Sequence, residues 1–367
     1  MADKITFFPV GNGDMTLIKF QNGTNILIDC NIRKSASEDD DQFDCKKYLF
    51  ENLPVHIDDI RYIDAFILTH HDNDHCRGTE EYFYFGDPDD ISDDERILIK
   101  ELIVAPKLLT TKESINDDAK KIRKEAKRRL KLYDENQNTF SKDGNRIQII
   151  GYSTDLKDYI NIMTVAGESI TRINGKRMAD YEFFVLGPIK KDNDDENAEI
   201  NDTSIVLKIS FKFINDGKTI VIILGGDETC DNWVDIINKN EDLTFDILLA
   251  PHHCSWHAIS NEDTHTGKVH ETISQFFENS KDKAHVISSS KPIKRNNDNP
   301  PSYRAKNEYL KHLEDENRFF CLGEYPEEED NKPLILDISK QGVQIDEPGE
   351  IKKKNFSKSI YTPKSYG

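Results

Sequence analysis

Six consecutive residues in the first quarter of the chain carry a dense set of metal-ligating side chains. They are His70-His71-Asp72-Asn73-Asp74-His75, and they follow the apolar run 65–69. Because that run is short, branched and aromatic, it predicts a buried strand, and the loop after it can direct imidazoles and carboxylates into one pocket. Imidazole suits zinc, iron or manganese, and carboxylates hold harder ions or bridge two of them. The alternative is a polar loop with incidental histidines, which would leave crowded charges without a partner.

The order of these residues resembles the HxHxDH signature of the metallo-β-lactamase superfamily. When the two are aligned on His70, the second histidine of the signature falls on Asp72, so the motif in this chain is HxDxDH. Cys76-Arg77-Gly78 follows it directly. This variant resembles the soluble hydrolase domain of the ComEC competence family and its free-standing relatives.

Further segments resemble that family and occur in the family's order. They are 10–14 (VGNGD), 26–31 (ILIDCN), 201–207 (NDTSIVL), 224–227 (LGGD) and 246–255 (DILLAPHHCS), the last with Cys254 where the family usually has glycine. The resemblance spans residues 5–290. It implies an α/β fold, the metallo-β-lactamase αββα sandwich of two mixed β-sheets with outer helices.

The resemblance also implies a dinuclear metal site with a role for each ligand. His70 and Asp72 would hold one ion, and Asp74 and His75 the other. Asp227 would bridge them, because two catalytic ions usually lie about 3.5–4 Å apart. The alternative for Asp227 is the N-cap of a helix that begins after it.

One further ligand would come from the PHHCS segment. Either His252 or His253 completes a coordination sphere, and the sequence does not choose between them. The other histidine would contact substrate or donate a proton. His71 is expected to pack away from the ions or to orient a ligand. The residues expected to act in catalysis are Asp74, Asp227 and His253.

Two departures from the family bear on the identity of the metal. The superfamily usually has a histidine ahead of the Gly-Asp strand, where this chain offers Asn201 and Asp202. Asp72 in place of histidine also shifts the site toward oxygen donors, which favours manganese or magnesium more than an all-histidine site would. The expected cofactors are two divalent ions, zinc or manganese.

Hydrophobic patterns and turn residues predict the elements that must position these ligands. Strands are expected at 5–20 and 25–29, joined at Asn22-Gly23, and at 62–69, 97–104, 181–187, 203–214, 218–224, 244–250 and 284–289, with helices at 43–53 and 114–133. Residues 1–345 are interpreted as one hydrolase domain with a charged helical insertion at about 80–145. Residues 346–367 are interpreted as a basic tail.

The net charge of −19 argues against binding of duplex DNA through general attraction, so only local basic segments could contact phosphate. One lies in the expected helix, where interleaved acidic residues also allow a solvated face. The basic residues of that helix are Lys120, Lys121, Arg123, Lys124, Lys127, Arg128, Arg129 and Lys131. A second lies near the expected metal site and contains Lys291, Lys294, Arg295, Arg304 and Lys306. A third opens the tail and contains Lys352, Lys353 and Lys354.

The sequence also predicts a compartment. No stretch approaches the apolar length of a membrane span, and the N-terminus lacks a charged-then-apolar leader. The six cysteines show no CxxC spacing. A cytoplasmic protein with free thiols and no membrane association is therefore expected.

Three hypotheses of function follow. The first is a metal-dependent phosphodiesterase or nuclease that acts on nucleic acid or a nucleotide. The second is a hydrolase of a small molecule such as a lactone, thioester or amide. The third is a metal-binding sensor with weak catalysis, which would bind a protein partner through the 80–145 insertion.

Overall fold

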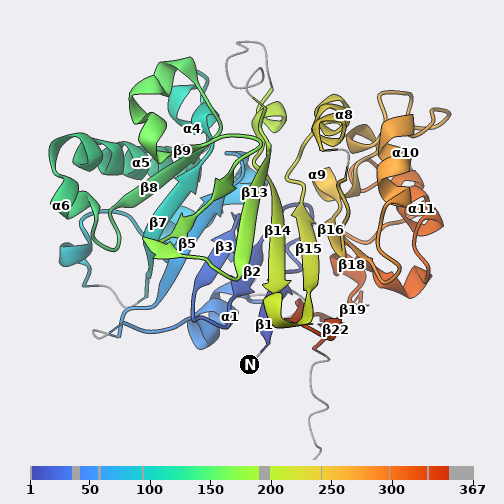
Figure 1. Ribbon diagram of the computed structural model, residues 1–367, viewed down its shortest axis with the longest axis horizontal. Helices are drawn as coiled ribbons and strands as arrows, with labels where there is room; N and C mark the ends of the chain where they lie inside the picture. The colour runs from blue at the N-terminus through green and yellow to red at the C-terminus, as the bar shows by residue number, and fades with distance from the viewer. Residues whose placement is uncertain are drawn as a thin grey trace, which may run out of the picture.

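Two large mixed β-sheets stack against each other in the computed structural model, with helices on their outer sides (Figure 1). The structure describes residues 2–34, 42–56, 59–92, 95–189, 199–240, 242–296, 298–328 and 330–346. The expected αββα sandwich of two mixed sheets is confirmed. Apart from Asp346, the segment interpreted as a basic tail lies outside the described residues.

The first sheet begins as an antiparallel meander and continues as a parallel array. Its strand order is β22-β21-β1-β2-β3-β5-β7-β8-β9, and β6 pairs with β7. The strands are β1 (Asp3–Phe7), β2 (Thr16–Lys19), β3 (Asn25–Ile28), β5 (Tyr62–Leu68), β6 (Phe83–Tyr84), β7 (Ile97–Val104), β8 (Arg146–Ile150), β9 (Met163–Thr164), β21 (Leu334–Ser339) and β22 (Gly342–Ile345). From β3 to β9 the paired strands run parallel, so their carboxyl ends share one edge.

The second sheet has the order β10-β13-β14-β15-β16-β17-β18. Its strands are β10 (Ser169–Ile170), β13 (Tyr181–Gly187), β14 (Val206–Phe213), β15 (Lys218–Leu224), β16 (Ile247–Leu249), β17 (His285–Ser288) and β18 (Phe319–Cys321). From β15 to β18 the pairs are parallel. The short strands β11 (Arg172–Ile173) with β12 (Lys176–Arg177), and β19 (Pro326–Glu327) with β20 (Asp330–Asn331), form separate hairpins. β4 (Cys30–Asn31) makes isolated bridges to Cys76 and Arg77.

Helices flank the two sheets. α4 to α6 lie on one side of the molecule and α8, α10 and α11 on the other (Figure 1). The α-helices are α1 (Cys45–Asn52), α2 (Asn73–Cys76), α3 (Thr79–Tyr82), α4 (Pro106–Thr110), α5 (Asp117–Glu135), α6 (Gln137–Phe140), α8 (Cys230–Lys239), α9 (Pro251–Cys254), α10 (Glu271–Glu278) and α11 (Tyr303–Lys311). Short 3₁₀ helices cover Pro88–Asp90, Thr154–Ile162, Asn201–Thr203, Ile214–Asp216, Trp256–Ala258, Glu316–Arg318 and Leu322–Glu324. No helix of the described chain is both long and apolar enough to cross a membrane.

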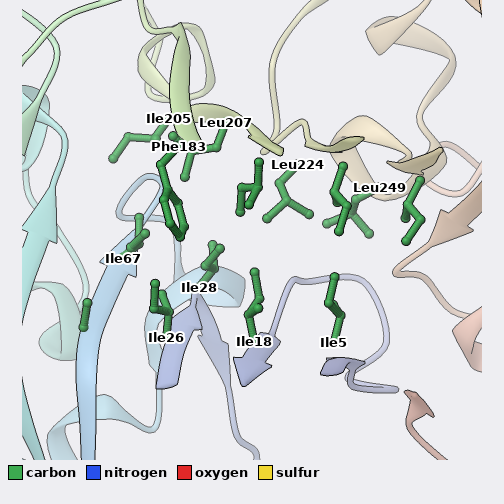
Figure 2. Close-up of a cluster of buried hydrophobic side chains, with 14 of the residues drawn as sticks. Ile5, Ile18, Ile26, Ile28, Ile67, Phe183, Ile205, Leu207, Leu224 and Leu249 are labelled. Atoms are coloured by element: carbon green, nitrogen blue, oxygen red, sulfur yellow. The ribbon is translucent and has the colours of Figure 1, made fainter. Parts of the chain in front are cut away.

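A layer of aliphatic and aromatic side chains fills the space between the sheets (Figure 2). Ile18, Ile26 and Ile67 of the first sheet face Phe183 and Leu207 of the second, and all are buried. Burial of apolar surface stabilises the pairing of the sheets by about 25 cal/mol per Å². Because this layer fixes one sheet against the other, it also fixes the strand ends of both sheets relative to each other.

Most expected strands are confirmed, with two corrections. The strands at 97–104, 181–187 and 218–224 agree with the predicted bounds, and the turn at Gly23 joins β2 to β3. The single strand expected at 5–20 is wrong, because residues 8–15 form a loop between β1 and β2. Pro9 and the two glycines of that loop are poor members of a ladder. Strands β21 and β22, which no pattern predicted, extend the first sheet beyond β1.

The segment 80–145 is part of the first layer. It contributes β7, which pairs with β5 and β8, and α5, which packs against α2 and α3. The Asn116 side chain caps α5 and donates to the His71 carbonyl (2.9 Å), and Asp118 accepts from the Glu80 backbone N–H (2.8 Å). The charged helix therefore supports the loop that carries the HxDxDH motif.

A buried ion pair holds α5 on the sheet. Glu125 and Arg129 are buried, and Arg129 Nε donates to Glu125 Oε1 (2.7 Å). The rest of the Arg129 guanidinium donates to the carbonyls of Ile99 and Arg146. These arginine contacts account for part of the basic cluster, while the lysines Lys120, Lys124 and Lys127 are exposed on the solvated face.

We expect the substitution Arg129→Ala to lower the free energy of unfolding by about 3 kcal/mol, because it leaves two carbonyls and a carboxylate less well satisfied in the interior. Urea denaturation measures the change. Lys127→Ala on the same helix is the matched control and should lie within about 0.5 kcal/mol of the wild type. A loss below about 1 kcal/mol for Arg129→Ala would contradict a structural role for this pair.

Candidate metal centre

Side chains that follow parallel strands of both sheets meet at one place. In the first sheet, Asp29 follows β3, and Thr69 and His70 follow β5. In the second sheet, Asp227 comes after β15 and His252 after β16. Crevices outside the carboxyl ends of parallel strands are the usual ligand sites of such sheets. The topology therefore brings the motifs that follow these strands together at one candidate site.

Four of these side chains form a buried cluster with the donor set of a metal site. Ligand atoms of Asp14, His75, Asp227 and His253 all lie within 4.8 Å of one another, and all four residues are buried. Asp227 Oδ1 lies 3.2 Å from His75 Nε2, and Asp227 Oδ2 lies 3.2 Å from His253 Nε2. Two carboxylates and two imidazoles suit divalent zinc or manganese.

Further histidine and aspartate side chains, which are common metal ligands, surround the same Asp227 carboxylate. Its Oδ2 lies 4.0 Å from His70 Nε2 and 3.8 Å from His252 Nε2. His70 Nε2 lies 3.8 Å from Asp72 Oδ2. Asp74 Oδ2 lies 3.5 Å from His253 Nε2. Asp227 thus stands between two groups of ligand types, one around His70 and the other around His75.

The buried Asp29 carboxylate orients the histidines. Asp29 Oδ2 accepts from His75 Nδ1 (2.8 Å) and from the Thr69 hydroxyl (2.6 Å). The Thr69 hydroxyl oxygen lies 3.1 Å from His70 Nδ1, so it can accept that N–H. Both Nδ1 atoms are therefore engaged behind the site, and both Nε2 atoms face it. A carboxylate behind a histidine is the usual outer partner of a metal ligand.

Two buried atoms of the site have no hydrogen-bond partner within the described structure. They are His70 Nε2 and Asp227 Oδ1. A buried polar atom without a partner costs about 1–3 kcal/mol, and both atoms are lone-pair donors. Burial holds the pKa of His70 well below its ordinary value, so its imidazole is neutral. A divalent cation would satisfy both atoms, so the donor set fits the expected metal.

Asp227 is ionised despite its burial. Burial alone raises the pKa of a carboxyl group, but the positive charge of His253 and His75 outweighs this and holds the pKa of Asp227 well below its usual range. A metal ion supplies positive charge at the same place. The carboxylate therefore needs cationic neighbours to remain charged in the interior.

The backbone beside the expected ligands adopts uncommon conformations. His252, His253 and Cys254 all have positive φ values (49°, 52° and 65°), which are uncommon for residues with a side chain. Gly226 also has a positive φ (52°), and its carbonyl accepts from the His252 N–H. Cys254 is fully buried in a left-handed conformation that glycine adopts more readily.

The structure shows where each expected site residue lies. It gathers His70, Asp72, Asp74, His75, Asp227, His252 and His253 around one point, with the distances given above. Both His252 and His253 lie close to Asp227. The N-cap interpretation of Asp227 is wrong, because Thr229 is the N-cap of α8.

Two site residues had no assigned role in the sequence analysis. Asp14 ends the VGNGD segment, and Asp29 lies inside the ILIDCN segment, directly after β3. Both segments supported only the fold. Position 13 requires glycine, because a Cβ on this residue would lie 2.1 Å from Asn31 Nδ2 and 2.6 Å from the Asp74 carbonyl. The Gly13 N–H donates to His253 Nδ1 (3.2 Å). The available signal was an aspartate in each of the two segments.

Several neighbours of the motif take other roles. His71 is buried, and burial lowers its pKa to about 4. Asp202 accepts from the Thr229 hydroxyl (3.0 Å), whereas Asn201 Oδ1 is buried without a hydrogen-bond partner in the described structure. The thiol of Cys76 donates to the Asp72 carbonyl (3.2 Å) and Cys254 is fully buried. All six cysteines are unpaired thiols, as expected.

Comparisons with known proteins add one structural likeness. No protein-family model and no curated protein matches this chain. Nineteen chains of solved structures match it, among them the crystal structure of a long form RNase Z from yeast. That match has 14% sequence identity and a TM-score of 0.37, and covers 92% of this chain and 42% of the other. The chain therefore spans less than half the length of that protein.

We expect Asp29→Asn to weaken metal binding by about 10–100-fold, because the neutral amide no longer fixes the His75 proton on Nδ1. Competition with a chromophoric chelator measures the affinity. Asp64→Asn is the matched control, since Asp64 is also a buried carboxylate but accepts from the Asn25 backbone N–H at the other end of β5. Equal affinity of Asp29→Asn and the wild type would contradict the orienting role.

Proposed function

We propose that this chain is a metal-dependent phosphodiesterase, a nuclease that uses two divalent ions, zinc or manganese. The observation that carries the proposal is the buried cluster of Asp14, His75, Asp227 and His253, with further ligand types around the same Asp227 carboxylate. Two ions that share a carboxylate form the usual apparatus of phosphodiester hydrolysis.

We infer the following division of ligands. His70, Asp72 and His252 would hold one ion. Asp74, His75 and His253 would hold the other, with Asp14 beside them. Asp227 would belong to both. His253 Nε2 lies 3.4 Å from His75 Nε2 and 3.5 Å from Asp74 Oδ2, and His70 Nε2 lies 3.8 Å from Asp72 Oδ2, which supports the two groups. His252 joins the first group as the remaining histidine beside Asp227 Oδ2.

The exposure of the ligands indicates the side from which substrate approaches. The imidazoles of His70 and His75 are fully buried, whereas the side chains of Asp72 and Asp74 are 41% and 34% exposed. Substrate would therefore enter on the side of the two carboxylates. The histidines form the floor, and the surrounding apolar core excludes water from behind them.

When bound, the two ions would lower the pKa of water and neutralise charge on a phosphoryl oxygen. The chain itself supplies the orientation of the ligands. His253 is enclosed by Asp14, Asp74 and Asp227, which fits a ligand. The His252 side chain is 25% exposed, so this ligand would lie closer to solvent than His253.

The carboxylate content of the site favours phosphoryl chemistry. Asp14, Asp72, Asp74 and Asp227 bring more oxygen donors than an all-histidine site, and such donors suit manganese or magnesium. Those ions commonly act on phosphate groups. A neutral ester or lactone needs no such excess of negative ligands.

We expect metal-stripped protein to hydrolyse bis-p-nitrophenyl phosphate and labelled single-stranded DNA only after manganese or zinc is restored. Asp227→Ala and Asp74→Ala should each lower the restored rate by at least about 100-fold, because each removes a proposed ligand. Asp202→Ala is the matched control, since that carboxylate bonds to Thr229, and should keep the activity within about threefold.

Tight metal binding without cleavage of any phosphodiester would contradict the proposal. Metal-dependent hydrolysis of lactones, thioesters or amides in the same preparation would assign the site to a small-molecule substrate instead. Restored cleavage that survives both ligand substitutions would show that the activity comes from a contaminating enzyme.

A further inference from the structure

A cavity of about 190 Å³ lies beside the metal centre, and basic residues line it. It is bounded by the loop after β1, the chain after β4 and the turn at Lys291-Pro292. Arg33 and Lys291 contribute its charged side chains, and Asn31 and Asn331 add amide groups. No carboxylate is among the described residues that line it, in a chain of net charge −19.

The Arg33 guanidinium lacks the partners that a protein normally gives such a group. Its Nε is buried without a hydrogen-bond acceptor, and no ion pair joins it to a described acidic residue. A Cβ on Gly11 would lie 2.9 Å from Arg33 Nη2, so the guanidinium lies directly against the Gly11 backbone. Burial and the nearby positive charge of Arg77 both lower the pKa of Arg33, and the more weakly acting negative charge of Asp74 opposes them. An anion would relieve both effects, because guanidinium groups match phosphate in charge and geometry.

Lys291 differs from three other basic residues of its segment, while Arg295 lies over the Tyr303 ring (5.0 Å to the ring centroid). Lys294 pairs with Glu328 (3.0 Å), Lys306 pairs with Glu324 (3.6 Å), and Arg304 donates to the Thr264 carbonyl (2.7 Å). The exposed Lys291 amino group makes no ion pair with the described residues, and the residue lines the cavity. Of the basic loop singled out in the sequence, Lys291 therefore has a charge that is free to bind a ligand.

One loop links the cavity to the metal centre. Gly11 lines the cavity, Asn12 Oδ1 accepts from the Lys291 backbone N–H (3.1 Å), and Asp14 belongs to the buried ligand cluster. The Ser289 hydroxyl donates to the Gly13 carbonyl (2.5 Å), which fixes the loop between the two sites. Three residues of chain span at most about 11 Å. A group held in the cavity is therefore close to a bond cleaved at the metal centre.

We propose that this cavity binds a phosphate group of the substrate other than the one that is cleaved. Arg33 supplies a planar pair of donors, Lys291 supplies a mobile point charge at the rim, and the shared loop sets the spacing. The inference rests on the proposed phosphodiesterase function and narrows it. The preferred substrate is a single nucleotide strand with at least two phosphates, rather than an isolated phosphodiester.

The test measures binding without turnover. Metal-stripped protein in excess chelator is titrated into a 5′-fluorescein-labelled oligothymidylate, and fluorescence anisotropy is followed at several salt concentrations. We expect Arg33→Gln and Lys291→Gln each to weaken binding by about tenfold. Each should also reduce the slope of log affinity against log salt by about 0.7. Lys294→Gln is the matched control on the same segment and should match the wild type.

Two competitors identify the group that is recognised. Inorganic phosphate should displace the strand from the wild type, and a mononucleotide should bind more weakly than the strand. Lys291→Gln keeps the test valid if Arg33→Gln fails to fold, because the Lys291 side chain is exposed. Unchanged affinity and salt slope in Lys291→Gln and in folded Arg33→Gln would overturn the proposal, and equal affinity for mononucleotide and strand would overturn the strand assignment.

The result is independent of the outcome for catalysis. Binding that depends on Arg33 and Lys291 in a protein that cleaves no phosphodiester would support the phosphate site and contradict the proposed enzyme. Metal-dependent cleavage by a protein whose strand binding does not depend on Arg33 or Lys291 would support the proposed enzyme and contradict the phosphate site.

Discussion

The rest of the site depends on one buried charge, the Asp227 carboxylate. Its oxygens lie 3.2 Å from His75 Nε2 and from His253 Nε2, and it follows the second sheet while His75 follows the first. A carboxylate in an apolar interior is costly unless positive charge compensates it. The two sheets must therefore meet with their strand ends aligned, and a cation between them removes the cost. The apolar layer between the sheets supplies that alignment, and Asp29 sets the direction of the histidine lone pairs.

The same constraint explains why unusual backbone is concentrated here. His252, His253 and Cys254 adopt left-handed conformations in succession, and Gly13 allows the loop after β1 to approach Asn31 and Asp74. Such conformations cost about 1–3 kcal/mol each, and they persist only where the surrounding structure enforces them. The loop from Gly11 to Asp14 then has two faces, one toward the ligand cluster and one toward the cavity with Arg33. In the proposed function, this one segment would relate the cleaved bond to a second phosphate.

Features encoded by neighbouring residues could be predicted from the sequence, whereas contacts between residues distant in the sequence could not. The HxDxDH motif follows its strand directly, so the periodic apolar run and the ligand types could be read together, and β7, β13 and β15 were predicted with their observed bounds. Asp14 and Asp29 act through contacts with residues distant in sequence, such as His253 and His75, which no local pattern encodes. The charge of Arg129 also gave no sign that Glu125 would hold it in the interior.

The number of divalent ions bound per chain tests the role of Asp227 most directly, and native mass spectrometry measures it after reconstitution with manganese or zinc. We expect two ions in the wild type. We also expect Asp227→Asn to bind fewer than two, because both ions would share that carboxylate, while Asp202→Asn keeps both. A wild type that binds a single ion, or an Asp227→Asn variant that retains two, would contradict the central role of Asp227.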